Sequence, residues 1–251
     1  AVAGGVTDPR LLAQAAAVRA SILLDAARGD AARGDYATAV RRLAQVEAIE
    51  GAGSAAATAA QLLPHYQVGE AGALTGAGNG VDAVTLLDAV SAAGNGALAA
   101  PVYPPALLAA GLQELSAGAP REAVADLQRL TQNFPGTSQA ARAQAMLAAP
   151  QAVTGTLVDR SGHPISGQVR LSSHFFNEPG GYYTTGPFYY SNADSTGTFR
   201  VTGVPVGGPY VLEVYRDGDW TTYVDPATGQ PSTPVTVTPM QPVDLTFVEL
   251  P

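Results

Sequence analysis

The residue types that could carry out catalysis are few and scattered in this chain. His65, His163 and His174 stand alone, without the His-Glu-x-x-His spacing that places two zinc ligands on one face of a helix. The Gly-x-Ser-x-Gly turn that exposes a serine nucleophile does not occur either. A Ser/His/Asp triad could still assemble in space, but no spacing points to one.

Two side chains with distinctive chemistry are missing altogether. All 13 basic residues are Arg, so the chain contains no Lys, and it contains no Cys. Schiff-base enzymes, serine-lysine acylases and Gly-Lys phosphate loops are therefore excluded, as are thiol nucleophiles and thiolate zinc sites. We expect no catalytic residue, no metal ligand and no cofactor, and hence a protein that is not an enzyme.

The acidic turns offer the one alternative to that expectation. Asp217 with Asp219, or Asp194 with Asp159, could share a calcium ion through oxygen ligands. Turn carboxylates more commonly bind solvent or their own backbone, and Asp159 stands before Ser161-Gly162, a typical turn composition. We predict that Asp159 caps this turn.

A dense run of aromatic residues is the best candidate for a binding surface. It comprises Phe175, Phe176, Tyr182, Tyr183, Phe188, Tyr189 and Tyr190. Adjacent residues of an extended chain point to opposite sides, so some of these rings must face away from the core. Tyr combines a large apolar area with a polar tip, which suits a contact surface. We predict that this loop, 175–190, binds another protein or a glycan. Alternatively, it folds back over its own domain or against the helical half.

Composition divides the chain into two parts near Pro150. Ala, Leu and Arg dominate residues 1–149, whereas Val, Thr, Tyr, Gly and Pro dominate residues 150–251, which predicts one helical and one β domain. Both parts carry more acidic than basic residues, so nucleic acid is not an expected partner. No apolar run approaches the roughly 20 residues that a membrane-spanning helix needs.

Apolar spacing of three and four residues predicts helices in the first part. A long helix follows the cap Asp8 and the first-turn residue Pro9. A turn with a following helix start then recurs at Gly34-Asp35-Tyr36, Gly78-Asn79-Gly80 and Gly118-Ala119-Pro120, and each copy carries an Ala at Ala39, Ala83 or Ala123. Helices are expected to end or kink at Pro64 and around Pro101–Pro105, because Pro removes a helical donor and clashes with the previous turn.

These units resemble tetratricopeptide repeats, in which a small Ala lets two helices approach closely. The last copy is similar to the repeats of bacterial envelope-assembly proteins of the Tol-Pal accessory kind, on Asn133-Phe134-Pro135-Gly136-Thr137-Ser138. The resemblance implies a stack of about seven helices with a concave groove for a peptide or protein. A simple spacer remains the alternative.

Short alternating runs predict strands in the second part, at Val153–Val158, Ile165–Ser172, Phe199, Tyr210, Trp220–Val224, Pro234–Val237 and Val243–Val248. With Asp159, Gly162, Pro164-Ile165 and Gly167, the stretch from Asp194 to Tyr215 resembles the carboxypeptidase regulatory-like family. That family is a non-catalytic, transthyretin-like antiparallel β-sandwich. The predicted fold class is thus multidomain, α then β.

Together these features predict a non-catalytic scaffold protein of the bacterial cell envelope. Its expected partners are other cell-envelope proteins, bound through the helical groove and the aromatic loop. A glycan-binding module is one alternative, and an accessory region of a larger peptidase-type enzyme is another. The chain starts at Ala1 with no initiator Met, which is compatible with a removed signal peptide and an extracytoplasmic location.

Overall fold

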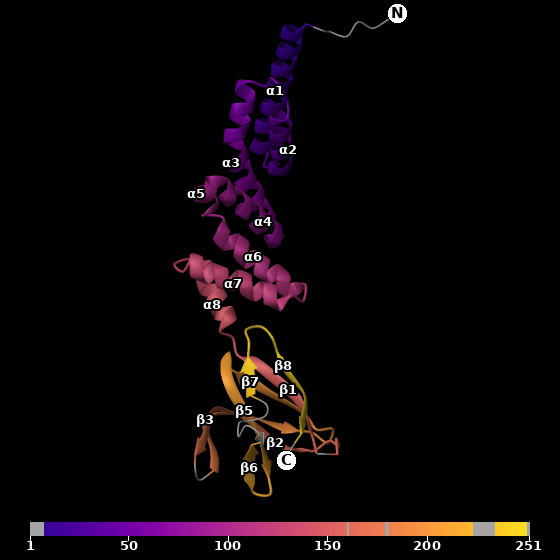
Figure 1. Ribbon diagram of the computed structural model, residues 1–251, viewed down its shortest axis with the longest axis vertical. Helices are drawn as coiled ribbons and strands as arrows, with labels where there is room; N and C mark the ends of the chain where they lie inside the picture. The colour runs from indigo at the N-terminus through magenta and orange to yellow at the C-terminus, as the bar shows by residue number, and fades with distance from the viewer. Residues whose placement is uncertain (1–7, 160, 179–180, 223–233, 250–251) are drawn as a thin grey trace, which may run out of the picture. The chain divides into compact units, whose positions relative to one another are not determined.

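The computed structural model describes residues 8–159, 161–178, 181–222 and 234–249. The chain forms two compact units, Ala1–Ala143 and Gln144–Pro251. Helices come first and strands follow (Figure 1), which confirms the predicted α-then-β class.

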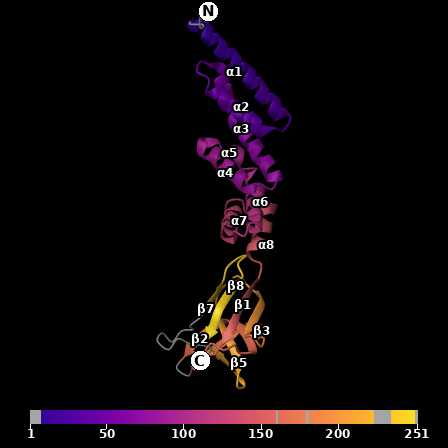
Figure 2. The same cartoon turned by 90° about the vertical axis from the view of Figure 1, so that its right-hand side faces the viewer.

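Seven helices of ten residues or more lie in the described part of the chain, as predicted. They are α1 (Pro9–Ala32), α2 (Tyr36–Glu47), α3 (Ser54–Gly76), α4 (Gly80–Val90), α6 (Tyr103–Ser116), α7 (Pro120–Asn133) and α8 (Ser138–Leu147). A π-helical turn, Ser91–Asn95, and the short α5 (Gly96–Ala99) connect α4 to α6. Helices α1 to α4 each pack against the next, and α6 packs against both α4 and α7. Within the helical unit, α1 lies at the end farthest from α7 (Figures 1 and 2).

The three predicted turns have the same backbone geometry. Gly34, Gly78 and Gly118 adopt φ angles of 81°, 83° and 74°, which favour glycine. The next amide in each turn donates to a carbonyl five residues earlier: Asp35 to Asp30, Asn79 to Leu74, and Ala119 to Glu114. This is the Schellman end of a helix, so each helix pair closes in the same way.

Small residues set the helix spacing, as the sequence predicts. Ala39, Ala83 and Ala123 are fully buried. At Gly80 the approach is closer still, because a Cβ atom there would lie 2.0 Å from the backbone nitrogen of Ala110. The first turn of α4 therefore packs directly on the backbone of α6.

Of the two predicted interruptions, the one at Pro64 does not end a helix, whereas the one around Pro101–Pro105 does. Pro64 lies inside α3, which continues on both sides of it. Tertiary packing outweighs the lost donor here, since residues such as Ala59 and Ala71 of the same helix are fully buried. By contrast, α5 ends at Ala99, and Pro104 lies in the first turn of α6, where a missing N–H leaves no helical bond unmade.

A polar network joins α4 to α6 and α7. Arg129 forms a two-pronged ion pair with Asp88, and the Tyr103 hydroxyl donates to the same carboxylate at 2.7 Å. The hydrogen bonds from Arg129 outweigh burial and lower the pKa of Asp88. The Tyr103 ring also stacks on Phe134, with centroids 5.8 Å apart. The network thus fixes the register of successive helix pairs.

Glu114 of α6 should make the helical unit more stable in mild acid. Burial, with Asp126 and Glu122 nearby, raises its pKa from 4.5 to about 6. Its Oε2 atom is buried and has no hydrogen-bond partner among the residues described. Because the folded pKa exceeds the unfolded one, the ionised carboxylate costs stability above pH 6. That cost shrinks as the pH falls and vanishes below about 4.5.

We therefore expect Glu114→Gln to raise the melting temperature at pH 7.5 but not at pH 4.5. The gain at pH 7.5 should be about 1 kcal/mol, less than the full linkage value, because solvent screens this partly exposed group. Thermal melts followed by circular dichroism measure both values. Glu47→Gln, which removes an exposed carboxylate of α2, is the matched control. Equal gains at both pH values would contradict the assignment.

The second unit contains two sheets. One has the order β4-β1-β8, and the other has β3-β2-β5-β6, with β7 pairing with β5 as well. The strands are β1 (Gln151–Val158), β2 (Gly167–Glu178), β3 (Gly181–Ala193), β4 (Thr198–Val204), β5 (Gly207–Arg216), β6 (Asp219–Thr222), β7 (Pro234–Val237) and β8 (Val243–Glu249). Part of the predicted strand Trp220–Val224 lies outside the described residues.

Alternating side chains from both sheets form a single core, as in a β-sandwich. Its largest fully buried member, Phe199 of β4, belongs to one cluster with residues such as Val153 of β1 and Leu171 of β2. All strand pairs are antiparallel in the described residues except β1 with β8, which is parallel. The predicted antiparallel sandwich is therefore confirmed, with one parallel pair at its edge.

No helix in the described ranges combines the length and the apolar character that crossing a membrane requires.

Candidate functional site

The aromatic segment is a β-hairpin, and the predicted loop is wrong. Strand β2 extends to Glu178 and β3 begins at Gly181, so most of residues 175–190 form a paired ladder. The ladder is irregular between Ser172 and His174. There the buried Ser172 hydroxyl lies 2.9 Å from the carbonyl oxygen of His174 and 3.2 Å from that of Thr185.

The predicted aromatic residues fall into three groups. Tyr189 turns inward and meets the core ring of Tyr210 edge-on, with centroids 6.1 Å apart. Phe188 lies against the side chain of Arg170 on the opposite face of the sheet, and Tyr190, 58% exposed, is close to it. This alternation is the one that the sequence predicts for adjacent aromatics.

The third group lies towards the tip of the hairpin. Phe176 and Tyr183 are paired across β2 and β3, and their exposed rings stack with centroids 4.8 Å apart. The side chains of Phe175 and Tyr182 lie outside the described part of the structure.

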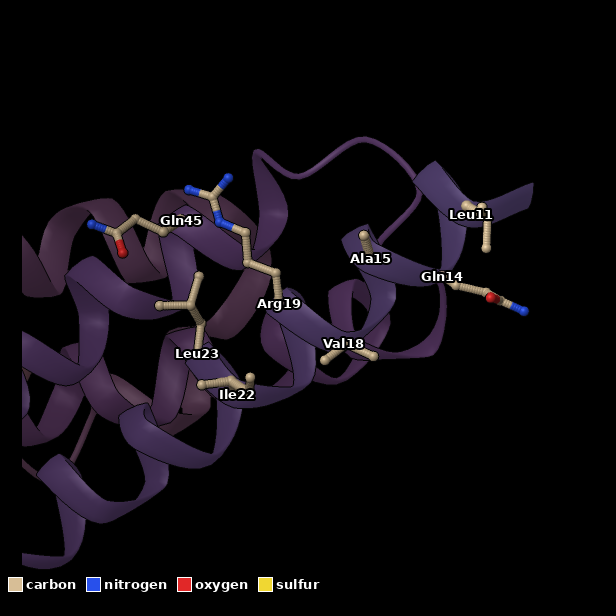
Figure 3. A pocket seen from close by; sticks show the side chains of 8 residues that line it. All are labelled: Leu11, Gln14, Ala15, Val18, Arg19, Ile22, Leu23 and Gln45. Atoms are coloured by element: carbon tan, nitrogen blue, oxygen red, sulfur yellow. The ribbon is translucent and has the colours of Figure 1, made fainter. Parts of the chain in front are cut away.

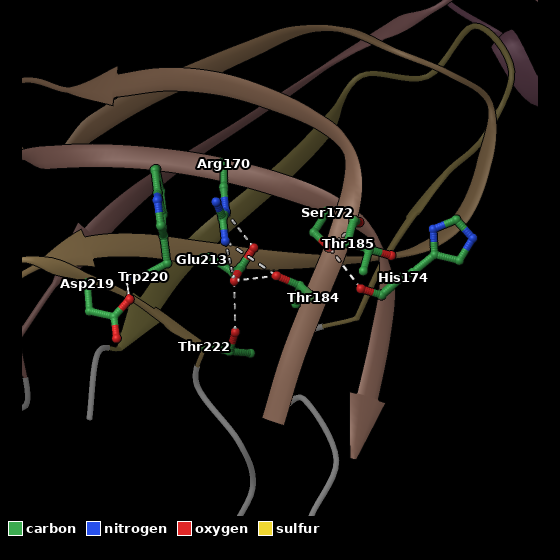
Figure 4. Close-up of polar contacts among 9 residues, drawn as sticks. All are labelled: Arg170, Ser172, His174, Thr184, Thr185, Glu213, Asp219, Trp220 and Thr222. Carbon is green, nitrogen blue, oxygen red and sulfur yellow. Dashed lines mark hydrogen bonds and ion pairs between the residues drawn. The ribbon is translucent and has the colours of Figure 1, made fainter. Parts of the chain in front are cut away.

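An ion pair occupies the centre of the outer sheet face. In the strand register, Arg170 of β2 lies between Tyr190 of β3 and Glu213 of β5. Arg170 Nε donates to Glu213 Oε2 at 2.7 Å, and Nη2 donates to Oε1 at 3.0 Å. Thr184 donates to the same Oε1 at 2.7 Å, with Thr222 of β6 at 3.5 Å (Figure 4). Four strands thus converge on one carboxylate.

Two aromatic rings enclose the guanidinium group. The Cζ atom of Arg170 lies 4.2 Å from the ring centroid of Phe188 and 4.1 Å from that of Trp220. Burial lowers the pKa of Arg170, but the hydrogen bonds and the charge of Glu213 outweigh that effect and hold it above its ordinary value. Arg170 therefore keeps its positive charge at every physiological pH.

This arrangement favours binding over acid–base chemistry. Glu213 is only 3% exposed, and its oxygens already accept hydrogen bonds from Arg170 and two threonines. The exposed rings around the pair remain available for contact. Trp220 lies between Tyr190 and Tyr215, at centroid distances of 5.8 and 5.4 Å.

A hollow of about 390 Å³ opens beside the ion pair. It is lined by Arg170, Tyr183, Thr184, Glu213, Asp219, Trp220, Thr221 and Thr222. Aromatic rings therefore stand beside hydroxyl and carboxylate groups. We call the hollow, together with Tyr190 and Tyr215, the aromatic face.

No sequence pattern marked Arg170, Glu213 or Trp220 as a site residue. The sequence did contain a signal, because Arg170 and Glu213 are charged residues within apolar stretches of their strands. Each alternates with core residues and therefore points to the outer face of the sheet. Their partnership depends on the β2–β5 register, which joins residues 43 apart and has no local signature.

The acidic turns behave as predicted for Asp159. Its carboxylate accepts from the amides of Ser161 at 2.8 Å and His163 at 2.9 Å, which lowers the pKa of Asp159, with the His163 bond as the largest cause. Asp194 caps its own turn in the same way, through Thr196. No group of three or more His, Cys, Asp or Glu residues that could hold a metal ion lies within the described ranges.

Two hollows of the helical unit lie on α1 and α2. One, of about 620 Å³, is lined by side chains of α1, most of them apolar, and by Gln45 of α2 (Figure 3). A second, of about 550 Å³, adjoins it around Arg19 and Ile49.

Comparison of the chain with protein-family models, with curated proteins and with solved structures finds no match in any of the three.

Proposed function

We propose that this chain is a non-catalytic scaffold protein of the bacterial cell envelope, which uses the aromatic face to bind another envelope protein. In this proposal a tetratricopeptide-like stack is joined to a carboxypeptidase regulatory-like sandwich, and the chain acts outside the cytoplasm. Tyr and Trp side chains are typical of the energetic centre of an interface, and here three exposed tyrosines surround the partly buried Trp220.

The observation that carries the proposal is the Arg170–Glu213 ion pair, which is held by further hydrogen bonds and lies among exposed aromatic rings. Arg170 and Glu213 tie four strands together, so the rings above them lose little freedom when a partner binds. Because no cation of this network is free, the face attracts its partner mainly through aromatic and hydroxyl contacts.

Substitution of two exposed tyrosines should abolish partner capture. We expect Tyr183→Ser combined with Tyr190→Ser to reduce capture of a stoichiometric partner from native envelopes at least about tenfold. Tyr is among the residues that contribute most to binding energy at interfaces. The two Ser substitutions remove only the rings and leave the hairpin in place. Replacing residues 175–190 with a Gly/Ser linker would remove the hairpin as well. Affinity purification in mild detergent followed by quantitative mass spectrometry measures the effect.

Arg200→Ser is the matched control, because it shortens an exposed side chain of β4 in the other sheet. Both variants should melt within about 2 °C of the parent protein, as expected for surface changes. Undiminished capture by the double tyrosine variant would rule out the aromatic face as the docking surface.

A glycan is the second candidate ligand, and the hollow favours it. Tyr183 and Trp220 offer ring faces to a sugar, while Asp219 and Thr221 offer polar groups at the rim. Calorimetric titration of the same variants with soluble cell-wall glycan fragments separates the two candidates. Heat that disappears in the double tyrosine variant, with no protein captured, would favour the glycan.

A further inference from the structure

Helix α1 carries apolar side chains on two opposite faces. One face packs into the helical unit through Ala20, Leu24 and Ala27, which are buried. Leu11, Leu12, Val18 and Ile22 lie on the other side and are between 52% and 64% exposed. Figure 3 shows three residues of this second face, Leu11, Val18 and Ile22. A helix that is apolar on both faces normally has packing partners on both.

The exposed face has the spacing of a coiled-coil seam. Leu11, Ala15, Val18 and Ile22 follow one another at intervals of four, three and four residues, which places them in one line along the helix. We call these four residues the α1 seam. They border the 620 Å³ hollow described above, so the seam is accessible.

Size and charge both favour a second copy in antiparallel orientation. If the two seams cross between Ala15 and Val18, each Leu11 meets Ile22 of the other copy and each Ala15 meets Val18. Small residues then face branched ones. Arg19, the one charged residue lining the hollow, lies beside Gln14 of the other copy, whereas a parallel pair would bring the two Arg19 side chains together.

We propose that two copies of this chain associate through their α1 seams as an antiparallel helix pair. The helix is already formed because its second half is packed against α2, so association carries little ordering cost. Four exposed side chains amount to a few hundred Å² per copy, the size of a weak interface, so we expect a Kd on the order of 10 μM.

Ionic strength gives a first independent readout. The chain carries a net charge of −8, so two copies repel one another, whereas the seam itself contains no charged residue. Added salt screens the repulsion and leaves the apolar contact intact. The dimer should therefore tighten several-fold between about 0.02 and 0.5 M salt, opposite to an interface held by ion pairs.

Sedimentation equilibrium of the full chain between about 1 and 200 μM tests the proposal. Ile22→Glu should weaken dimerisation at least about 30-fold, because it buries a charge in the seam. Val81→Glu adds the same charge to the exposed start of α4 and should leave the dimer unchanged. Circular dichroism should show native helix content in both. A monomer throughout that range, or a dimer insensitive to Ile22→Glu, would overturn the proposal.

Cysteine pairing tests the orientation, since the chain has no Cys of its own. A mixture of Leu11→Cys and Ile22→Cys proteins should form the mixed disulfide, and each protein alone should form little. In the antiparallel pair, equal positions lie about 16 Å apart along the axis, beyond disulfide reach. Cross-linking of each variant with itself, without the mixed product, would overturn the antiparallel arrangement.

Discussion

Gly80→Ala should destabilise the helical unit by about 3 kcal/mol and lower its melting temperature by roughly 10 °C. The added Cβ atom would lie 2.0 Å from Ala110 N and 2.3 Å from the carbonyl carbon of Ala109. Both are backbone atoms, so no side-chain rotation relieves the collision. The helices α4 and α6 must separate, and the buried contacts between them are lost. Thermal melts monitored at the helical band of the circular dichroism spectrum measure the change.

Gly72→Ala is the matched control in the neighbouring helix α3. A Cβ atom there meets nothing within 4 Å, and the position is exposed. Because Ala has the higher helix propensity, this change should stabilise the unit by about 0.5–1 kcal/mol. If both glycines tolerate Ala equally, the close packing of α4 on α6 is not as described.

Arg170→Met should destabilise the β unit by about 3 kcal/mol or more, because it leaves the Glu213 carboxylate buried without its counter-ion. Met fills the space between Phe188 and Trp220, so the loss reports on charge more than on a cavity. Chemical denaturation followed by the fluorescence of Trp220, the one Trp in the chain, measures it.

The double variant Arg170→Met, Glu213→Met separates pairing from packing. Replacing both partners removes the uncompensated charge, so most of the lost stability should return. Arg200→Met on β4 removes an exposed arginine and should change stability by less than about 0.5 kcal/mol. A double variant as unstable as Arg170→Met alone would show that the ion pair is not the source of the effect.

The helical half was predictable because its signals are local. Gly34, Gly78 and Gly118 each mark a turn through their own backbone conformation, and the buried Ala39, Ala83 and Ala123 follow at a fixed distance. The continuation of α3 through Pro64 was not predictable, for the opposite reason. The cost of this Pro to the helix is local, but the packing that offsets it comes from neighbouring helices that the sequence does not place.

In the β half, the core strands were predictable from alternation and the aromatic hairpin was not. Gly186-Pro187 and the paired aromatics read as a loop, because regular alternation is interrupted there. In the structure the β2–β3 pairing shifts register between Ser172 and His174, and regular pairing continues on both sides of the shift. The ion pair of the candidate site requires the register of β2 against β5, a long-range property that no single segment encodes.

Strand β3 ends its sheet, since in the described residues it pairs with β2 alone. A free strand edge is normally a template for another strand, in fibrils as in specific complexes. Pro187 interrupts that template, because it offers no N–H, and it lies beside the ladder irregularity. The sheet therefore cannot be lengthened evenly along β3. A ligand on this edge is therefore recognised by side chains, and the edge is protected against the open-ended stacking to which exposed strands are prone.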